Sequence, residues 1–269
     1  MIEVLITGAG SGLCDSILEA IDVVQGDYRL RLIDSMESAG EARRFQGRTI
    51  VIELDTEADL STADLVLDLN QTYSGDAEAF RPQLSLVMML QRLLSSLEPG
   101  TVRALHGAVR EPAVEQAQGV EALASQVTQL FNGRDPEPKP FGGTLAFNAR
   151  TLDETALIEA LPEIDALTNA SISLERWQSD SFYTVHASLW MQLDEKGIAS
   201  LLSLTNQDYV PGLSVSPDSG RVDHDADMMI CARRISDDWV HLILTADLEK
   251  TIWAHEAKRI LSKTLGVAS

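Results

Sequence analysis

A mostly apolar segment that runs directly into a glycine-rich turn is the feature that most constrains the fold of this chain. Residues 2–6 are largely aliphatic with little alternation, which is typical of a strand buried on both faces of a parallel sheet. Glycines follow at positions 8, 10 and 12, and residues 13–24 then repeat apolar side chains at helical spacing. This order of strand, turn and helix predicts the first unit of a Rossmann-like α/β domain.

The remaining sequence divides into two patterns. In the first part, the expected elements are strands at 29–33, 49–54 and 63–69, a polar turn at 35–44, a polar stretch at 70–81 and a helix at 84–97. In the second part, they are strands at 102–109, 171–177, 182–193, 228–235 and 239–245, and helices at 113–131 and 248–265. The polar alternation of these later strands predicts an α+β domain with a mostly antiparallel sheet.

Two domains are therefore expected. The first is a shortened Rossmann-like domain over residues 1–83, completed by a helix within residues 249–269, and the second is the α+β domain over residues 84–248. A chain of 269 residues with 45% hydrophobic residues is long enough to bury two cores of ordinary domain size.

The charge balance limits the partners of the protein. Asp and Glu number 41 against 21 Lys and Arg, which gives a formal net charge of −20. Nucleic acids and anionic membranes are therefore not expected as partners, since both are bound by an excess of Lys and Arg. We find no leader and no apolar run long enough for a membrane span, so a cytoplasmic location is expected. The two cysteines and five histidines show no metal-ligand spacing, and no metal site is predicted.

The glycine turn has two interpretations. Glycines after the first strand let a backbone approach a pyrophosphate, which favours a dinucleotide site. However, a G-x-G-x-x-G spacing would need glycine at Leu13, and the G-x-x-G-x-x-G variant would need glycines at Ser11 and Cys14. The turn is therefore either a cofactor site or a structural turn. Cys14 likewise is either a thiol activated by the helix N-terminus or a small packing residue.

The segments 119–134 (GVEALASQVTQLFNGR) and 145–148 (LAFN) resemble the aspartate-semialdehyde dehydrogenase family, most closely its Usg-type non-catalytic paralogues. Segments 38–40 (SAG), 182–188 (FYTVHAS) and 246–250 (ADLEK) are similar to further motifs of that family. The resemblance implies that the second domain is glyceraldehyde-phosphate-dehydrogenase-like and mediates dimerisation. It also implies a deletion in the first domain, between Asn70 and Leu84.

The resemblance also implies which functional residues remain. The nucleophilic cysteine of the family falls on Leu84, in Pro82-Gln83-Leu84-Ser85, and leucine cannot form the thioacyl intermediate. The arginine that binds the substrate carboxylate falls on Ser179, with Arg176 nearby, whereas the acid/base histidine is kept as His186. The remnant cofactor-binding residues would be Gly8, Gly10, Ser11, Gly12, Ser38, Ala39 and Gly40.

We therefore expect a catalytically inactive homodimeric paralogue, paired through the second domain, with a further protein partner left open. Its interface would be supplied by Tyr183, Leu189, Trp190 and Met191. One alternative is an NAD(P)-dependent semialdehyde dehydrogenase of amino-acid biosynthesis with an altered nucleophile. A second alternative is a nucleotide-binding sensor. Any binding of NAD or NADP should be weak, and weaker for NADP because Glu37 would repel its 2′-phosphate.

Overall fold

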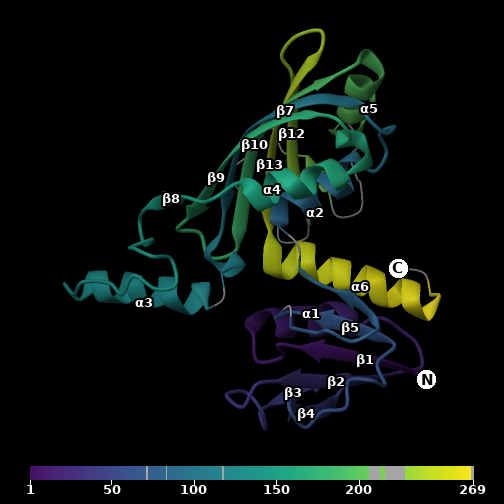
Figure 1. Ribbon diagram of the computed structural model, residues 1–269, viewed down its shortest axis with the longest axis vertical. Coiled ribbons are helices and arrows are strands. Elements are labelled where there is room, and N and C mark those ends of the chain that lie inside the picture. Colours follow the sequence, from purple (N-terminus) through teal and green to yellow (C-terminus); the bar gives the residue numbers. More distant parts are fainter. Residues whose placement is uncertain (71, 83, 117, 206–212, 216–227, 268–269) are drawn as a thin grey trace. The chain divides into compact units, whose positions relative to one another are not determined.

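The structure is a computed structural model that describes residues 1–70, 72–82, 84–116, 118–205, 213–215 and 228–267 (Figure 1). The chain separates into two compact units. Unit 1 comprises Met1–Gln83 and Trp253–Ser269, and unit 2 comprises Leu84–Ile252. Each unit has its own sheet and its own core.

Unit 1 contains a six-stranded sheet with the order β3-β4-β2-β1-β5-β6, in which only the β3–β4 pair is antiparallel. Its strands are β1 (Ile2–Thr7), β2 (Tyr28–Asp34), β3 (Ala42–Phe45), β4 (Arg48–Leu54), β5 (Leu65–Asp68) and β6 (Glu78–Phe80). Its helices are α1 (Gly12–Ile21) and α6 (Ala254–Leu265), which pack against each other. The Rossmann-like fold class predicted from the first strand, turn and helix is confirmed.

The two faces of this sheet are covered differently. The side chains of Val4, Ile6 and Leu32 are fully buried on one face, which α1 and α6 cover. On the other face, Leu5 and Ile33 pack with Val66, Tyr73 and small residues of the segments 58–63 and 77–79. Loops thus replace the second helical layer that a longer Rossmann domain would have.

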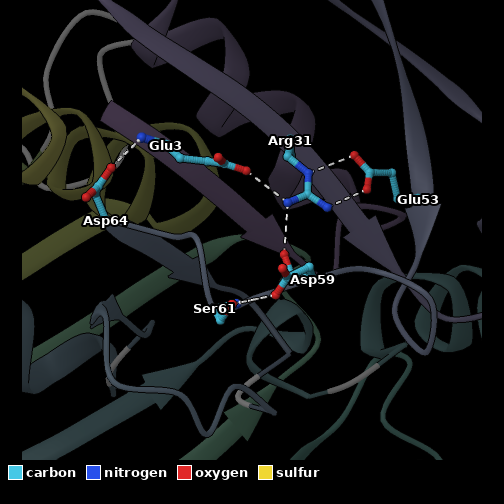
Figure 2. Close-up of polar contacts among 6 residues, drawn as sticks. All are labelled: Glu3, Arg31, Glu53, Asp59, Ser61 and Asp64. Atoms are coloured by element: carbon cyan, nitrogen blue, oxygen red, sulfur yellow. Dashed lines mark hydrogen bonds and ion pairs between the residues drawn. The ribbon is translucent and has the colours of Figure 1, made fainter. Parts of the chain in front are cut away.

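An arginine-centred network joins the strands on this loop-covered face (Figure 2). Arg31 on β2 donates to both carboxylate oxygens of Glu53 on β4, at 2.9 and 2.6 Å, and to Glu3 on β1 at 2.9 Å. It also donates to the carbonyl of Asp59 at 2.9 Å, which fixes the adjacent loop. The hydrogen bond from Arg31 lowers the pKa of Glu53. Because Arg31 is paired with both Glu53 and Glu3, none of these partly buried charges is left without a partner on the sheet surface.

Two edge strands of unit 1 lie in segments expected to be irregular. The predicted turn at 35–44 ends in β3, which forms a hairpin with β4 through Gln46 and Gly47, at φ values of +48° and +72°. The polar stretch at 70–81 contains β6. Edge strands are short and often polar, so they lack the apolar periodicity on which the prediction depended.

Unit 2 contains a seven-stranded mixed sheet with the order β11-β12-β13-β10-β7-β9-β8. Its strands are β7 (Val102–Glu111), β8 (Ala149–Thr151), β9 (Ser171–Ser179), β10 (Thr184–Leu193), β11 (Leu213–Val215), β12 (Met228–Arg234) and β13 (Trp239–Asp247). Its helices are α2 (Ser85–Leu94), α3 (Gly119–Phe131), α4 (Thr155–Ala160) and α5 (Glu195–Thr205), with short turns η1 (Ala113–Glu115), η2 (Leu161–Glu163), η3 (Asp165–Leu167) and η4 (Leu248–Trp253). Only β7–β9 and β11–β12 are parallel, which confirms the mostly antiparallel α+β prediction.

The central strand β10 shows how the two faces of this sheet differ. Leu189 and Met191 are 0% exposed and point to the core face, whereas Trp190 between them is 40% exposed. The expectation that Leu189 and Met191 would supply an intermolecular interface is therefore wrong, because strand alternation directs them into the core of unit 2. Of these three residues Trp190 alone lies on the opposite face, which we call the open face.

The long helix expected over 113–131 is interrupted. The chain forms η1, turns at Gln118 with φ +57°, and starts α3 at Gly119. A Cβ at Gly119 would overlap the carbonyl of Ala113, so this close turn requires glycine. The final helix also begins later than expected, at Ala254, because the π-helical turn η4 precedes it.

Candidate functional site

The glycine turn that joins β1 to α1 is held by side chains of unit 1. A Cβ at Gly10 would overlap the hydroxyl of Ser38, so the structure brings these two predicted cofactor residues into contact. The Gly10 N–H donates to Asp34 Oδ2 at 2.5 Å, and the Ser11 N–H donates to the Gly8 carbonyl at 3.2 Å. Two of the N–H groups that could face a phosphate are therefore used within the protein.

The other predicted cofactor residues lie close by. Gly12 is exposed and begins α1, so it lies at the positive end of that helix. Ala39 and Gly40 follow Ser38 in a turn that leads to β3, and the Gly40 N–H donates to the Ile52 carbonyl at 2.9 Å. These backbone contacts position the segment at the carboxyl ends of the strands, where open α/β sheets bind ligands.

Asp34 is a functional candidate that the sequence reasoning missed. It ends β2 and lies 24 residues after Gly10. In Rossmann folds an acidic residue at this place accepts hydrogen bonds from the ribose 2′-hydroxyl of NAD, and it repels the 2′-phosphate of NADP. The position of Asp34 at the end of the second strand was the signal that could have identified it.

The nearest guanidinium in this region is already neutralised. Arg43 on β3 lies 3.1 Å from Asp15 and 3.1 Å from Glu41, and it donates to the Gly10 carbonyl at 3.4 Å. Glu37 is exposed one position before Ser38. Both carboxylate oxygens of Asp34 already accept backbone N–H groups, Oδ2 from Gly10 and Oδ1 from Ser35 at 2.7 Å. The carboxylates of Asp34 and Glu37 would repel the 2′-phosphate of NADP, and the turn offers few free donors to a pyrophosphate.

Cys14 has the character of a packing residue. Its side chain is fully buried in α1. Burial, followed by the negative charge of Asp15, raises the pKa of the Cys14 thiol to about 12. The thiol remains protonated at neutral pH, which favours the structural interpretation over the reactive one.

The position that matches the family's nucleophile lies at the start of α2 in unit 2. Leu84 immediately precedes the helix and Ser85 is its first residue. The Leu84 side chain is an aliphatic group, which can neither attack a carbonyl carbon nor leave as a thiolate. Ser85 is fully buried.

His186 lies on the open face of the sheet in β10. Its Nδ1 lies 3.0 Å from the hydroxyl of Thr245 on β13, and its register partner on β7 is Arg110. Burial lowers the pKa of His186, and the positive charge of Arg110 lowers it further. The imidazole is therefore neutral at pH 7, and it is held in place by its contact with Thr245.

The remaining substrate-binding candidates lie on β9. Arg176 donates to Glu111 Oε1 at 2.7 Å and to the Asp153 carbonyl at 3.0 Å. The hydroxyl of Ser179 donates to the Glu111 carbonyl at 3.2 Å. Arg176 is thus bound within the protein, and Ser179 offers no positive charge to a carboxylate.

Strand alternation separates His186 from these residues. Arg110, its register partner, is exposed on the open face, whereas the next residue, Glu111, is buried on the core face and bound to Arg176. Ser85 lies on the same side as Glu111, because it contacts the neighbouring residue Glu115. The hydrogen bond described for His186 goes to Thr245, and among the residues with described positions no hydrogen bond or ion pair joins His186 to the start of α2.

The segment that carries the strongest sequence resemblance is organised by one buried amide. Gln126 of α3 donates to the carbonyls of Glu137 and Gly143 at 2.7 and 3.1 Å, and it accepts from the N–H groups of Leu145 and Ala146 at 2.8 and 3.1 Å. These four bonds close the loop between the helix and the following LAFN segment. Gln126 and the LAFN segment, which both belong to the resemblance, therefore have a structural role here.

Comparisons with known proteins identify the fold. The chain is similar to a probable aspartate-semialdehyde dehydrogenase from Pseudomonas aeruginosa, with TM-score 0.78, 16% identity and coverage of 98% of both chains. It is also similar to aspartate semialdehyde dehydrogenase II from Vibrio cholerae complexed with ASA, with TM-score 0.79, 18% identity and coverage of 99% of this chain and 98% of that one. The enzyme from Francisella tularensis gives TM-score 0.68 at 14% identity, with coverage of 98% and 99%.

At these identities the likeness shows a shared fold. No protein-family model matches the sequence, and no curated protein matches it. Within the described ranges, none of the helices has the length and apolarity needed to cross a membrane.

Proposed function

We propose that this protein is an aspartate-semialdehyde dehydrogenase-like member of the Usg type, a homodimer that has lost the dehydrogenase reaction. The observation that carries this proposal is Leu84 at the start of α2, where the family resemblance places the nucleophilic cysteine. The reaction would need a thiolate there to form the thiohemiacetal from which hydride leaves. Without that sulfur, neither hydride transfer nor release to phosphate has a covalent intermediate.

The surroundings of Leu84 support the same proposal. Arg176 is bound to Glu111, so it is not free to hold a substrate carboxylate. His186 lies on the opposite face of the sheet from Glu111 and cannot act on a group at Ser85. Groups that act as a unit lose their effect together, so one surviving histidine does not preserve the activity.

A turnover assay tests the loss of activity. Purified protein is supplied with aspartate semialdehyde, phosphate and either NAD or NADP, and reduced cofactor is followed by absorbance. We expect no rate above the protein-free control. A rate that is proportional to protein and disappears in His186→Ala would support the alternative of an enzyme with an altered nucleophile.

Dimerisation is proposed through the open face of the unit 2 sheet. Trp190 stacks on His241 with ring centroids 4.5 Å apart, and His106 stacks on Trp239 at 5.6 Å. These rings form an aromatic surface across β7, β10 and β13, and a twofold mate could cover it with the same surface. The family resemblance implies dimerisation through this domain.

A nucleotide-binding sensor is the second candidate, and Asp34 is the observation that favours it. A sensor needs a nucleotide site but no nucleophile, and the carboxylate at the end of β2 suits the ribose of NAD. Calorimetric titration with NAD and with NADP would separate this candidate from a scaffold that binds neither. Binding of NAD that Asp34→Ala abolishes would favour the sensor.

A further inference from the structure

Residues 119–148 form a part of unit 2 that stands away from its strands (Figure 1). This segment, which we call the arm, begins with α3 and ends with the LAFN segment. Its main packing partner among the other helices and strands is the turn η1, and its small core contains Leu123, Phe141 and Leu145 together with Ala113 of η1. The four hydrogen bonds of Gln126 join α3 to the loop after it, so the arm projects as a fixed piece.

Two phenylalanine rings are exposed at the end of α3 that lies away from η1. Phe131 is 79% exposed and Phe147 is 64% exposed, and their centroids lie 6.0 Å apart in an edge-to-face arrangement. Leu130, which is 36% exposed, precedes Phe131. With about 200 Å² for a whole aromatic side chain, the two rings present roughly 300 Å² to solvent. Apolar patches of this size on a single chain often serve as interaction sites.

The backbone at Phe147 directs this ring outward. Leu145 and Ala146 are 0% and 2% exposed, and the chain then turns at Phe147 with a φ of +61°. The left-handed region is unfavourable for a bulky side chain, and strained conformations of this kind are concentrated at functional positions. The turn keeps the ring out of the core of the arm and beside Phe131, so the fold maintains the exposed pair at a cost in free energy.

The charge of the arm suits a second copy of the same chain. The arm contains three acidic residues and two basic ones, a net charge of −1, whereas the whole chain carries −20. The charged residues of the arm are Glu121, Arg134, Asp135, Glu137 and Lys139. Two copies of so acidic a chain repel each other across most of their surfaces, and they can approach where the surface is nearly neutral. A strongly charged partner would instead favour a surface of opposite charge.

The arm is continuous with the open face, through which dimerisation is proposed above. It is attached through η1, which follows β7, and β7 carries His106 of the aromatic surface. Trp190 is 40% exposed and so presents roughly 100 Å². A stable interface needs about 800 Å² from each partner. A dimer that covered the open face alone would leave the larger exposed aromatic surface, the Phe131–Phe147 pair, in water.

We propose that the Phe131–Phe147 pair of each copy packs against unit 2 of the other copy, so that two arms as well as the open faces hold the dimer. Twofold symmetry repeats the contact, which buries four phenylalanine rings in one dimer. The rings are already positioned by the Gln126 hydrogen bonds, so little conformational freedom is lost on binding. This inference rests on the proposed dimer and adds a second contact to it.

The first test is the dissociation constant of the dimer, measured by sedimentation equilibrium on the full chain. A variant combining Phe131→Ser with Phe147→Ser should dimerise at least about 100-fold more weakly than the parent, because it removes four buried rings. The control combines Val23→Ser with Met36→Ser, which are 66% and 79% exposed in unit 1, and it should dimerise like the parent. Circular dichroism checks that each variant is folded.

The second test identifies what the arm touches. A photoreactive benzoylphenylalanine replaces Phe131, and the protein is mixed with ¹⁵N-labelled parent chain before irradiation. We expect cross-linked peptides that join an unlabelled chain to a labelled one and that end in residues 84–252. The same group in place of Val23 should give no cross-link between chains.

Three results would overturn the inference, and they distinguish it from the proposed dimer. If the parent is a monomer at tens of micromolar, the dimer and the arm contact both fail. If Trp190→Asp gives a monomer while the double phenylalanine variant dimerises like the parent, the dimer stands and the arm contact fails. If the cross-links from position 131 join residues of one chain only, the rings are covered by their own chain.

Discussion

Replacing Glu115 by glutamine should remove the cost of ionising a buried carboxyl, a cost in folding free energy that grows with pH. The pKa of Glu115 is raised from 4.5 to about 8, mainly by burial and next by the charge of Glu111. A carboxyl whose pKa is raised on folding stabilises the folded state below its unfolded pKa, and this stability is lost as pH rises through the folded pKa. The parent chain should therefore lose stability, relative to Glu115→Gln, across the window from pH 4.5 to about 8.

The magnitude follows from the same values. Within the window each pH unit changes the free energy of unfolding by about 1.4 kcal/mol, so the full effect has a ceiling of ~5 kcal/mol. Local relaxation and water entry reduce the cost of a buried charge, and we expect the variant to be more stable than the parent by at least ~2 kcal/mol above the window. Glutamine keeps the shape of the protonated carboxyl and cannot ionise.

Urea denaturation followed by circular dichroism measures the effect, from about pH 5.5, above the isoelectric point, to about pH 8.5. Glu121→Gln on α3 is the matched control, because it removes a carboxyl from an exposed position. The control should follow the parent at every pH. Parallel curves for the parent and Glu115→Gln across this range would refute the assignment of a protonated buried carboxyl.

Three further predictions concern the dimer, the nucleotide and the lost nucleophile. Trp190→Asp should convert a dimer to a monomer in sedimentation velocity, because it places a charge in the open face, while the exposed Met36→Asp in unit 1 should leave the dimer intact. Asp34→Ala should weaken NAD binding about tenfold in calorimetry, since the ribose loses a charged acceptor, and an unchanged affinity would contradict that role. Leu84→Cys should form a thiol that alkylating reagents modify but should not restore turnover, because Arg176 remains bound to Glu111; full activity would contradict the account of the site.

The fold could be predicted well where each element has its own apolar period. The strand at 2–6 and the helix after the glycine turn carry their pattern locally, so the Rossmann-like class followed from them. The edge strands β3 and β6 could not be predicted, because they are short and their stability comes from pairing with β4 and β5. Nor does the sequence show that Leu189 and Met191 face the core of unit 2 rather than a partner. Both faces of β10 carry large side chains, and only the packed helices decide between them.

Some residues of the candidate sites could be predicted from the sequence and others could not. Asp34 could have been found, because its distance from the glycine turn and its place after a predicted strand are both readable in sequence. The ion pair of Glu111 with Arg176 could not be predicted, since these residues are 65 positions apart and meet only through the parallel pairing of β7 with β9. The separation of His186 from the start of α2 depends on the same register. A sequence motif assigns residues to roles, but sheet faces decide which of them can act together.

A single-turnover experiment tests the central claim, a dehydrogenase fold without dehydrogenase chemistry. Protein at a concentration comparable to the cofactor is mixed rapidly with aspartate semialdehyde, phosphate and either NAD or NADP. Absorbance of the reduced cofactor is recorded from the first milliseconds, so that chemistry is seen even where product release is slow. We predict no burst with either cofactor, as expected for Leu84 in place of a nucleophile. A burst of reduced cofactor that is stoichiometric with the protein would contradict the account.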